Sequence, residues 1–366
     1  MNKPIRKVTS KNANRPQSGD FFKSKNAHLV LKNKLKFEGR VPLWQQNSAP
    51  GEVVFNTGMT GYVESLTDPS YSEQILVFTY PLIGSYGVHS TRWESKRIHA
   101  KGVVVSDQIN GWSHPGSDKS FLQWLKQQDV PVIFDVDTRE LTQYLRAKGV
   151  INGVINSKNT QISNFTPAKP LVSINKPRLS KVAGAKKTVV LVDCGVKENI
   201  SRSLQRRKLD VLRVPYNYDF TKEKYDGVVL SNGPGDPKDY QQTTGIIKKV
   251  LKSDKPVFGI CLGSQLMSLA AGARTYKLKF GHRGHNQPCI DKTTDKCYIT
   301  SQNHGYAVDK STLPKDWEVY FTNLNDDSVE GIIHKSKPFF SVQFHPEASP
   351  GPTDTEWLFE RFKQCL

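Results

Sequence analysis

The chain has 366 residues, of which 37% are hydrophobic, so it is long enough for two ordinary domains or one large one. No apolar run approaches the roughly 20 residues that a bilayer-spanning helix needs, so we expect no membrane association. The five cysteines form no CxxC pair, and their odd number favours free thiols in a reducing compartment over a disulfide framework.

The formal net charge of +18 invites comparison with nucleic-acid-binding proteins, but the distribution of this charge argues against that class. Residues 1–40 carry 11 Lys and Arg against 2 acids, and residues 151–190 carry 7 against none. These two segments hold 16 of the 18 excess charges, and both lack the interleaved aromatic residues of a base-stacking surface. We therefore expect no nucleic-acid partner.

In chain order, residues 1–27 are predicted to be a disordered basic tail, with an organelle transit segment as the alternative. Residues 28–156 combine β-rich runs such as "EVVFNTGM" and "QILVFTYP" with the helical spacing of "SFLQWLKQQD", which predicts a mixed α/β domain. A further helix is expected to begin after Asp137, a favourable N-cap, and to end at Gly149, a typical helix stop.

Residues 157–187 are rich in Lys, Asn, Ser and Pro and show little periodicity, so they are predicted to be an interdomain linker. Over residues 188–366 strand-like runs such as "KTVVLVDCG" and "DVLRVP" alternate with helix-like runs such as "KENISRSLQRRK". This alternation predicts an open, mostly parallel sheet flanked by helices on both faces. The last part is β-rich before a closing helix, "TDTEWLFERFKQCL".

The stretch "VFGICLGSQL" places Cys261 between a strand-like run and the start of a helix. Such an elbow holds a nucleophile clear of the sheet, and Gly259 and Gly263 leave the turn uncrowded. The unpaired N–H groups of a helix start stabilise a thiolate and can also bind an oxyanion. The alternative is a buried structural cysteine, which is the more common role of a free cysteine.

A cysteine nucleophile also needs a base and a group that orients the base. The stretch "FSVQFHPEASPG" supplies His345 and Glu347 at the end of an apolar strand; alternatively they are a capping histidine beside a surface glutamate. The loop "SNGPGDP" over residues 231–237 follows another strand and offers backbone donors that a substrate can approach closely, or it is an ordinary turn.

Together, "GICLGSQ", "SNGPGDP" and "HPE" resemble the triad-type glutamine amidotransferases over residues 188–366. Two further stretches, "KFGHRGHNQP" and "TSQNHGYAV", narrow the choice among families of glutamine amidotransferases. Upstream, "GEVVFNTGMTGYVESLTDPSYSEQILVFTYPLIGSYGV" and "VDTRELTQYLRAKG" resemble the N-terminal domain of the carbamoyl phosphate synthetase small-subunit family. The resemblance covers residues 28–366. Amidotransferases of anthranilate or GMP synthesis lack the upstream domain.

This resemblance implies roles for individual residues. Cys261 is expected to be the nucleophile that forms a thioester, with His345 and Glu347 completing the triad. The residues expected to bind L-glutamine are Ser70, Gly233, Gly235, Leu262, Gln265, Asn303, Gly305 and Tyr306. Backbone N–H groups near Leu262 and Gly233 are expected to face the oxyanion, while the amides of Gln265 and Asn303 suit the zwitterionic head group.

The chain departs from the family pattern at three positions. Ser264 stands where the family usually has His, Gly58 stands where Ser or Ala is frequent, and Tyr306 replaces a frequent Phe. Because the His that Ser264 replaces is not the base, we expect glutamine hydrolysis to survive, with coupling to a partner or glutamine affinity open to change.

The chain has neither a GxxxxGK[ST] phosphate loop nor a G-x-G-x-x-G after a strand, so we expect it to make ammonia only. The resemblance places the ATP chemistry on a large synthetase subunit, reached through an ammonia tunnel in a heterodimer. ATP and its metal ions are expected on that partner, and no cofactor or metal site on this chain. The scattered His89, His99 and His114 are interpreted as solvated or structural.

Three other functions stay open at this point: an amidotransferase of another pathway, a regulatory subunit whose glutaminase has decayed, and a basic nucleic-acid binder. The upstream domain, the complete triad and the location of the charge argue against them in that order. The expected location is the cytoplasm, or a plastid in an alga or plant. The sequence does not separate arginine from pyrimidine synthesis, and it does not reveal effectors.

Overall fold

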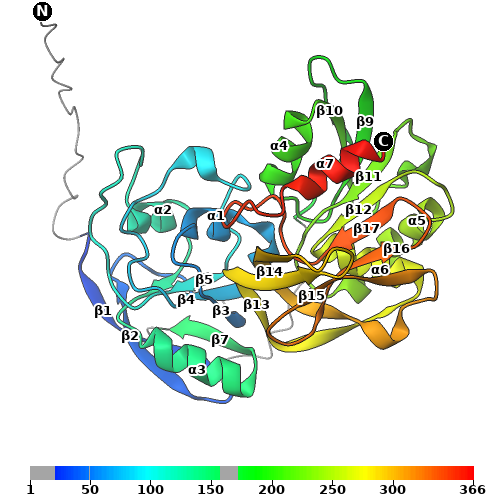
Figure 1. The fold of residues 1–366 in the computed structure, drawn as a ribbon. Coiled ribbons are helices and arrows are strands. Elements are labelled where there is room, and N and C mark those ends of the chain that lie inside the picture. Colours follow the sequence, from blue (N-terminus) through cyan, green and yellow to red (C-terminus); the bar gives the residue numbers. More distant parts are fainter. Residues whose placement is uncertain (1–20, 49, 157–171) are drawn as a thin grey trace, which may run out of the picture.

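The computed structural model describes residues 21–48, 50–156 and 172–366, which form two α/β domains lying side by side (Figure 1). The N-terminal domain is built on a seven-stranded sheet and the C-terminal domain on a ten-stranded sheet. The predictions made for residues 1–20 and 157–171 lie outside the described residues.

The N-terminal sheet has the strand order β2-β1-β7-β3-β4-β5-β6. Strands β3 to β6 are parallel, whereas β1 and β7 pair antiparallel with their neighbours. The strands are β1 (Ser24–Leu31), β2 (Lys36–Pro42), β3 (Pro50–Asn56), β4 (Gln74–Phe78), β5 (Gly102–Val104), β6 (Val132–Ile133) and β7 (Ile151–Asn156). Parallel and antiparallel pairs in one sheet make this the mixed α/β domain that the sequence predicts.

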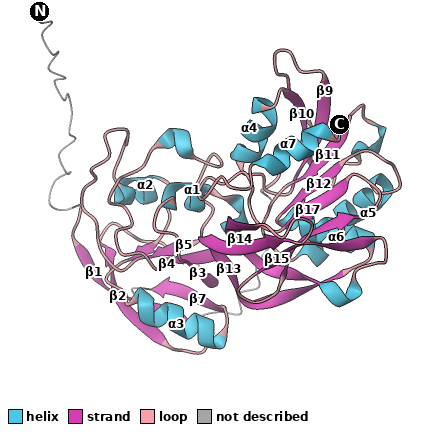
Figure 2. Ribbon diagram, in the orientation of Figure 1, coloured by secondary structure: helices cyan, strands magenta, loops and turns pink. Residues whose placement is uncertain are grey.

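Helices cover both faces of this sheet, as Figure 2 shows. α1 (Tyr62–Thr67) and α2 (Phe121–Gln127) pack their apolar residues on one face, and α3 (Thr138–Lys148) packs on the other. The expected helix is confirmed in α3, where the carboxylate of Asp137 accepts a hydrogen bond from the backbone N–H of Glu140. It ends at Gly149, whose φ of 94° favours glycine.

The C-terminal sheet has the order β14-β13-β15-β16-β17-β12-β11-β9-β10-β8. Strands β17, β12, β11, β9 and β10 are parallel, and the remaining strands join antiparallel at the two edges. The strands are β8 (Arg178–Ser180), β9 (Lys187–Asp193), β10 (Leu209–Pro215), β11 (Gly227–Leu230), β12 (Val257–Ile260), β13 (Arg274–Asp291), β14 (Cys297–Asp309), β15 (Trp317–Asn323), β16 (Val329–His334) and β17 (Phe339–Val342).

The parallel strands are apolar on both sides because helices cover both faces. One core contains residues of α5 (Gln241–Val250) and α6 (Leu262–Ala271), and the other contains residues of α4 (Glu198–Arg206) and α7 (Trp357–Gln364). This arrangement confirms the predicted open sheet. It also brings the carboxyl ends of β11 and β12 to one edge, where ligands bind in folds of this kind.

The long β13–β14 hairpin reaches from the C-terminal sheet to the N-terminal domain (Figure 1). The backbone N–H of Val150 donates to the carbonyl of Lys279, and that of Thr57 donates to the carbonyl of Arg283. The hairpin therefore fixes the seam between the two domains.

Two boundaries differ from the predicted ones. Strand β1 begins at Ser24, inside the segment predicted as a tail, because its polar first residues are held by backbone pairing with β2. Strand β8 lies inside the predicted linker and pairs with β10 at the sheet edge. Among the described residues, no helix has the length and apolarity to span a bilayer.

Candidate active site

Cys261 occupies a sharp turn between β12 and α6. Its φ of 53° and ψ of −107° fall outside the regions that non-glycine residues ordinarily adopt. Such strain persists only where the surroundings enforce it, and it is typical of functional sites. The strand–turn–helix geometry that the sequence predicts for this cysteine is therefore present.

Two glycines let the elbow pack tightly. A Cβ on Gly263 would lie 2.2 Å from the carbonyl oxygen of Leu230, and one on Gly259 would lie 2.7 Å from the carbonyl oxygen of Gly263. No side chain fits at these distances. The glycines thus allow strand β11 and the start of α6 to approach each other directly behind Cys261.

His345 and Glu347 lie behind the cysteine in the turn after β17. Nδ1 of His345 is 2.6 Å from Oε1 of Glu347, and both residues are buried. Nε2 of His345 has no hydrogen-bond partner among the described residues, which leaves it for the thiol of Cys261. The structure therefore brings together the three predicted triad residues, whose catalytic roles remain predictions.

The charges of this group depend on one another. Burial disfavours the imidazolium of His345, but the Glu347 carboxylate and the sulfur of Cys261 together outweigh burial and raise the pKa of His345 to about 10. Burial also opposes ionisation of Glu347, yet Lys197 and His345 lower its pKa to about 2. His345 is thus set to carry a proton at neutral pH.

Lys197 is a functional residue that the sequence did not predict. Its Nζ lies 2.9 Å from Oε1 of Glu347, and only 2% of the side chain is exposed. Glu94, from the N-terminal domain, also interacts with this lysine. A lysine just before a helix is an ordinary feature in a sequence, and the 150 residues that separate it from Glu347 hide the pair.

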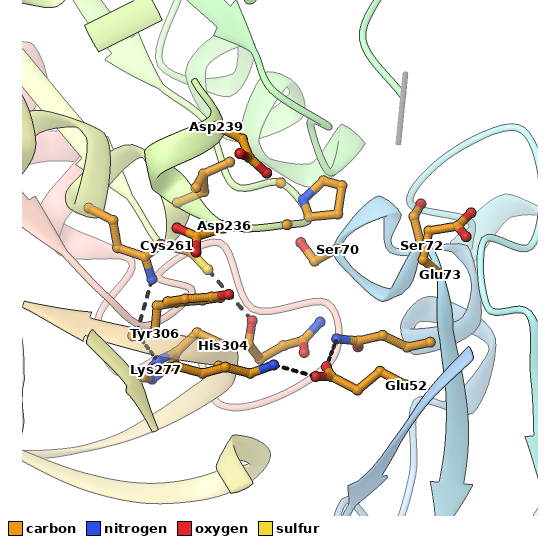
Figure 3. A pocket seen from close by; sticks show the side chains of 18 of the residues that line it. Glu52, Ser70, Ser72, Glu73, Asp236, Asp239, Cys261, Lys277, His304 and Tyr306 are labelled. Atoms are coloured by element: carbon orange, nitrogen blue, oxygen red, sulfur yellow. Dashed lines mark hydrogen bonds and ion pairs between the residues drawn. The ribbon is translucent and has the colours of Figure 1, made fainter. Parts of the chain in front are cut away.

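The thiol of Cys261 opens into a cavity of about 310 Å³ between the two domains (Figure 3). All eight residues predicted to bind glutamine line this cavity: Ser70, Gly233, Gly235, Leu262, Gln265, Asn303, Gly305 and Tyr306. They come from both domains and from sequence positions more than 200 residues apart. Their convergence on one amino-acid-sized space supports the predicted binding site without testing the role of each residue.

The "SNGPGDP" loop follows β11 and forms part of the cavity wall. A Cβ on Gly233 would lie 2.2 Å from the carbonyl oxygen of Cys194 and 2.9 Å from the Leu262 side chain, so the loop backbone lies directly against the elbow. Gly235 has a φ of 91°, which favours glycine. The loop is therefore both a turn and a surface of exposed backbone beside the nucleophile.

Asp68 of the N-terminal domain holds two parts of the cavity wall, the loop after β11 and strand β14. Its carboxylate accepts hydrogen bonds from the side-chain amides of Asn232, at 3.2 Å, and Asn303, at 3.1 Å. Asn232 also donates to Oγ of Ser70. Asp68 is a second residue that sequence analysis missed, although it stands in the quoted "DPSYS" stretch.

Arg283 is a third missed residue. It lines the cavity, only 5% of it is exposed, and no carboxylate lies within ion-pair distance in the described part of the chain. One guanidinium N–H donates to the carbonyl of Phe280, while Nε has no partner in the same described ranges. Burial lowers the pKa of Arg283. The Glu52 carboxylate in the cavity wall opposes this shift, but Arg283 forms no direct ion pair among the described residues.

Two of the three departures from the family pattern have local explanations. Ser264 is buried and hydrogen-bonds Ser341 on β17, and it is not among the residues that line the cavity. A Cβ on Gly58 would lie 2.4 Å from the His285 ring, so a larger residue does not fit here. Tyr306 lies in the cavity wall.

The comparison with known families agrees with this geometry. Residues 190–365 match the family described as "Glutamine amidotransferase class-I", so the C-terminal domain and its cysteine elbow define a protein of that class. Residues 29–155 match "Carbamoyl-phosphate synthase small chain, CPSase domain". The chain belongs to the carbamoyl-phosphate synthase small chain family, which confirms the resemblance seen in the sequence.

Individual relatives support the same assignment. The chain is 47% identical over 360 residues to the "Carbamoyl phosphate synthase arginine-specific small chain" of Saccharomyces cerevisiae, covering 92% of this chain and 87% of that protein. It is 49% identical over 331 residues to the protein of the same name from Emericella nidulans, covering 85% and 73%. It is also 47% identical over 357 residues to "Multifunctional protein CAD" of Squalus acanthias, covering 93% of this chain but only 16% of that larger protein.

Proposed function

We propose that the chain is the glutaminase subunit of a carbamoyl phosphate synthase. It hydrolyses L-glutamine through a cysteine thioester and delivers the ammonia to a large subunit that makes carbamoyl phosphate from bicarbonate and ATP. The observation that carries this proposal is the Cys261 elbow, backed by His345 and Glu347, at the floor of a cavity lined by all eight predicted glutamine contacts.

The reaction proceeds in two halves. The sulfur of Cys261, as thiolate, attacks the side-chain amide carbon of glutamine, and the amide oxygen takes up the negative charge. Backbone N–H groups of Leu262 and Gly233 are the proposed donors to this oxyanion. When the C–N bond breaks, His345 gives its proton to the departing nitrogen and ammonia leaves.

The second half releases glutamate. Water loses a proton to His345 and attacks the thioester carbon, and the C–S bond breaks to regenerate the cysteine. Glu347 keeps the imidazole oriented, with its Nδ1 bound and its Nε2 directed to the reacting atoms. These steps use no cofactor on this chain, and ATP is proposed to act on the partner alone.

The proposed partner is a large ATP-binding synthetase chain. The relatives include both separate small chains and a multifunctional protein of which this chain covers 16%. Their "arginine-specific" names support arginine synthesis as a destination of the product, with pyrimidine synthesis as the second destination that we infer.

The test is Cys261→Ser in the complex with its large subunit. Glutamine-dependent synthesis and glutamine hydrolysis should both fall to background, because serine at this elbow lacks the thiolate. Synthesis from added ammonia should persist, because that chemistry is proposed to take place on the other subunit. Undiminished glutamine hydrolysis by the variant would refute the assignment of the nucleophile.

A further inference from the structure

Two imidazoles and one carboxylate meet beneath the wall of the glutamine cavity. His282 of β13, His304 of β14 and Glu330 of β16 each place one potential ligand atom within 4.8 Å of the others. The three residues come from three strands, and His282 and Glu330 are 48 positions apart. This separation explains why the sequence predicts no metal site.

Each imidazole is oriented by a contact at its outer nitrogen. Nε2 of His282 is 2.9 Å from Oδ2 of Asp326, which turns Nδ1 toward Glu330. Nδ1 of His304 is 2.8 Å from the carbonyl oxygen of Tyr306, which turns Nε2 toward the same carboxylate. Metal-binding histidines characteristically pair their second nitrogen with a carboxylate or a backbone carbonyl in this way.

The spacing of the three groups also suits a metal. Oε1 of Glu330 is 3.2 Å from Nδ1 of His282 and 3.7 Å from Nε2 of His304. Charge-assisted hydrogen bonds between such groups are shorter, about 2.7–2.9 Å. Neighbouring ligands around a tetrahedral zinc ion lie about 3.4 Å apart, given metal–ligand bonds of about 2.0–2.1 Å.

The carboxylate has an unused oxygen. Glu330 is fully buried, and its Oε1 accepts a hydrogen bond from the side-chain amide of Asn323 at 3.1 Å. Its Oε2 has no hydrogen-bond partner among the residues described by the structure. Gln302 adds a further oxygen, Oε1, at 3.0 Å from Nε2 of His304. Oxygen acceptors thus surround the two ring nitrogens that face inward.

We propose that His282, His304 and Glu330 bind one divalent cation, best matched by Zn²⁺, which two imidazoles and a carboxylate suit. The ion ties three strands together and holds His304, which lies between the cavity residues Asn303 and Gly305. Its role is structural, because its ligands come from three neighbouring strands of one sheet. The proposal does not depend on the mechanism of glutamine hydrolysis.

Cobalt is the probe for this site, because Co²⁺ replaces Zn²⁺ and reports its ligands by absorption. The full chain, stripped with a chelator, is titrated with Co²⁺. One equivalent should give visible d–d bands without the near-ultraviolet thiolate charge-transfer band, which separates this site from the five free cysteines. Glu330→Gln, which keeps the size of the side chain, should abolish this signal.

A second variant covers the case in which Glu330→Gln does not fold. The side chain of Asp326 is 40% exposed, so Asp326→Asn leaves the core intact while weakening the support of His282. Cobalt affinity should fall about 10- to 100-fold. Asp327→Asn is the matched control, since it makes the same change at the adjacent exposed residue, and it should bind like the parent chain.

Two results would overturn the proposal. One is a parent chain that shows no thiolate-free cobalt signal, and the other is a signal that Glu330→Gln and Asp326→Asn leave unchanged. In either case the three residues form a hydrogen-bonded cluster only.

Discussion

Lys197, Glu347 and His345 form a row of alternating charges buried behind the nucleophile. Breaking a buried ion pair by removing one partner typically costs about 3–5 kcal/mol, because the remaining charge is left uncompensated. Removal of Lys197 would leave Glu347 with His345 as its only close cation within the described part of the chain. Removal of His345 leaves the Lys197–Glu347 pair intact, so a His345 variant separates catalysis from folding more cleanly.

His345→Asn should lower the rate of glutamine hydrolysis about 10²- to 10⁴-fold, the usual share of general acid–base catalysis. The thermal midpoint should change much less, because the buried Lys197–Glu347 ion pair stays intact. Steady-state kinetics and a thermal melt measure the two effects. His114→Asn, at an exposed histidine, is the control and should hydrolyse glutamine at the parent rate. A normal rate in His345→Asn would remove this residue from the triad.

Arg283 is expected to bind the α-carboxylate of glutamine, because it is a buried cation in the cavity without an ion-pair partner in the described ranges. A hydrogen bond to a charged group contributes about 1.5–3 kcal/mol. Arg283→Met should therefore lower kcat/KM for glutamine about 10- to 150-fold, mainly through KM. Arg283→Lys keeps the positive charge, so its kcat/KM for glutamine should fall less than that of Arg283→Met.

Stability offers an independent check on Arg283. Burial lowers its pKa, which means that the folded chain holds this charge against a desolvation cost. Loss of the guanidinium should therefore change the thermal midpoint little. An unchanged KM together with a large fall in the midpoint would show that Arg283 supports the fold and does not bind substrate.

The elbow between β12 and α6 depends on glycine at a position where helices otherwise favour alanine. Gly263→Ala should destabilise the chain by about 1–3 kcal/mol and abolish most activity, because its Cβ would meet the Leu230 carbonyl at 2.2 Å. Gly245→Ala, inside α5, is the matched control. Nothing lies within 4 Å of a Cβ there, so it should stabilise the chain by about 1 kcal/mol.

Chemical denaturation measures both effects, and glutaminase assays report the geometry of the elbow. Equal changes in stability in the two variants would contradict the packing argument. They would show that the helix propensity of alanine outweighs the contact with Leu230.

The elements that could be predicted from the sequence are those whose determining residues lie close together along the chain. The Cys261 elbow is one, because strand, glycine, cysteine, glycine and helix follow one another directly. The missed residues act over long distances: Lys197 meets Glu347 across 150 positions, and Asp68 meets Asn303 across 235. The early start of β1 was missed because backbone pairing holds polar residues in a strand. Periodicity and spacing carry no signal for such contacts.

At the scale of the whole molecule, the glutamine cavity belongs to neither domain alone. Glu52 and Ser70 come from the N-terminal domain and face Cys261 and Lys277 of the C-terminal domain (Figure 3). Gln74 and Lys277 both contact the Glu52 carboxylate. The position of one domain against the other therefore sets the shape of the substrate site.

Asp68 is the residue through which this dependence can be measured. Its carboxylate accepts hydrogen bonds from Asn232, on the loop after β11, and from Asn303, on strand β14 of the same C-terminal domain. Asp68→Asn replaces one acceptor oxygen with a donor NH₂ group that faces another NH₂ group. An unsatisfied buried group costs about 1–3 kcal/mol, so KM for glutamine should rise about 5- to 150-fold. Since the triad is not touched, kcat should change less.

Asp137→Asn is the control for this change, because Asn caps a helix as well as Asp does, and α3 lies away from the cavity. Its KM should equal that of the parent chain. If KM in Asp68→Asn also stayed at the parent value, the loop after β11 and strand β14 would keep their positions without the N-terminal carboxylate, and the cavity would be a property of the C-terminal domain. A rise in KM confined to Asp68→Asn would instead show that contacts between the two domains contribute to the affinity for glutamine.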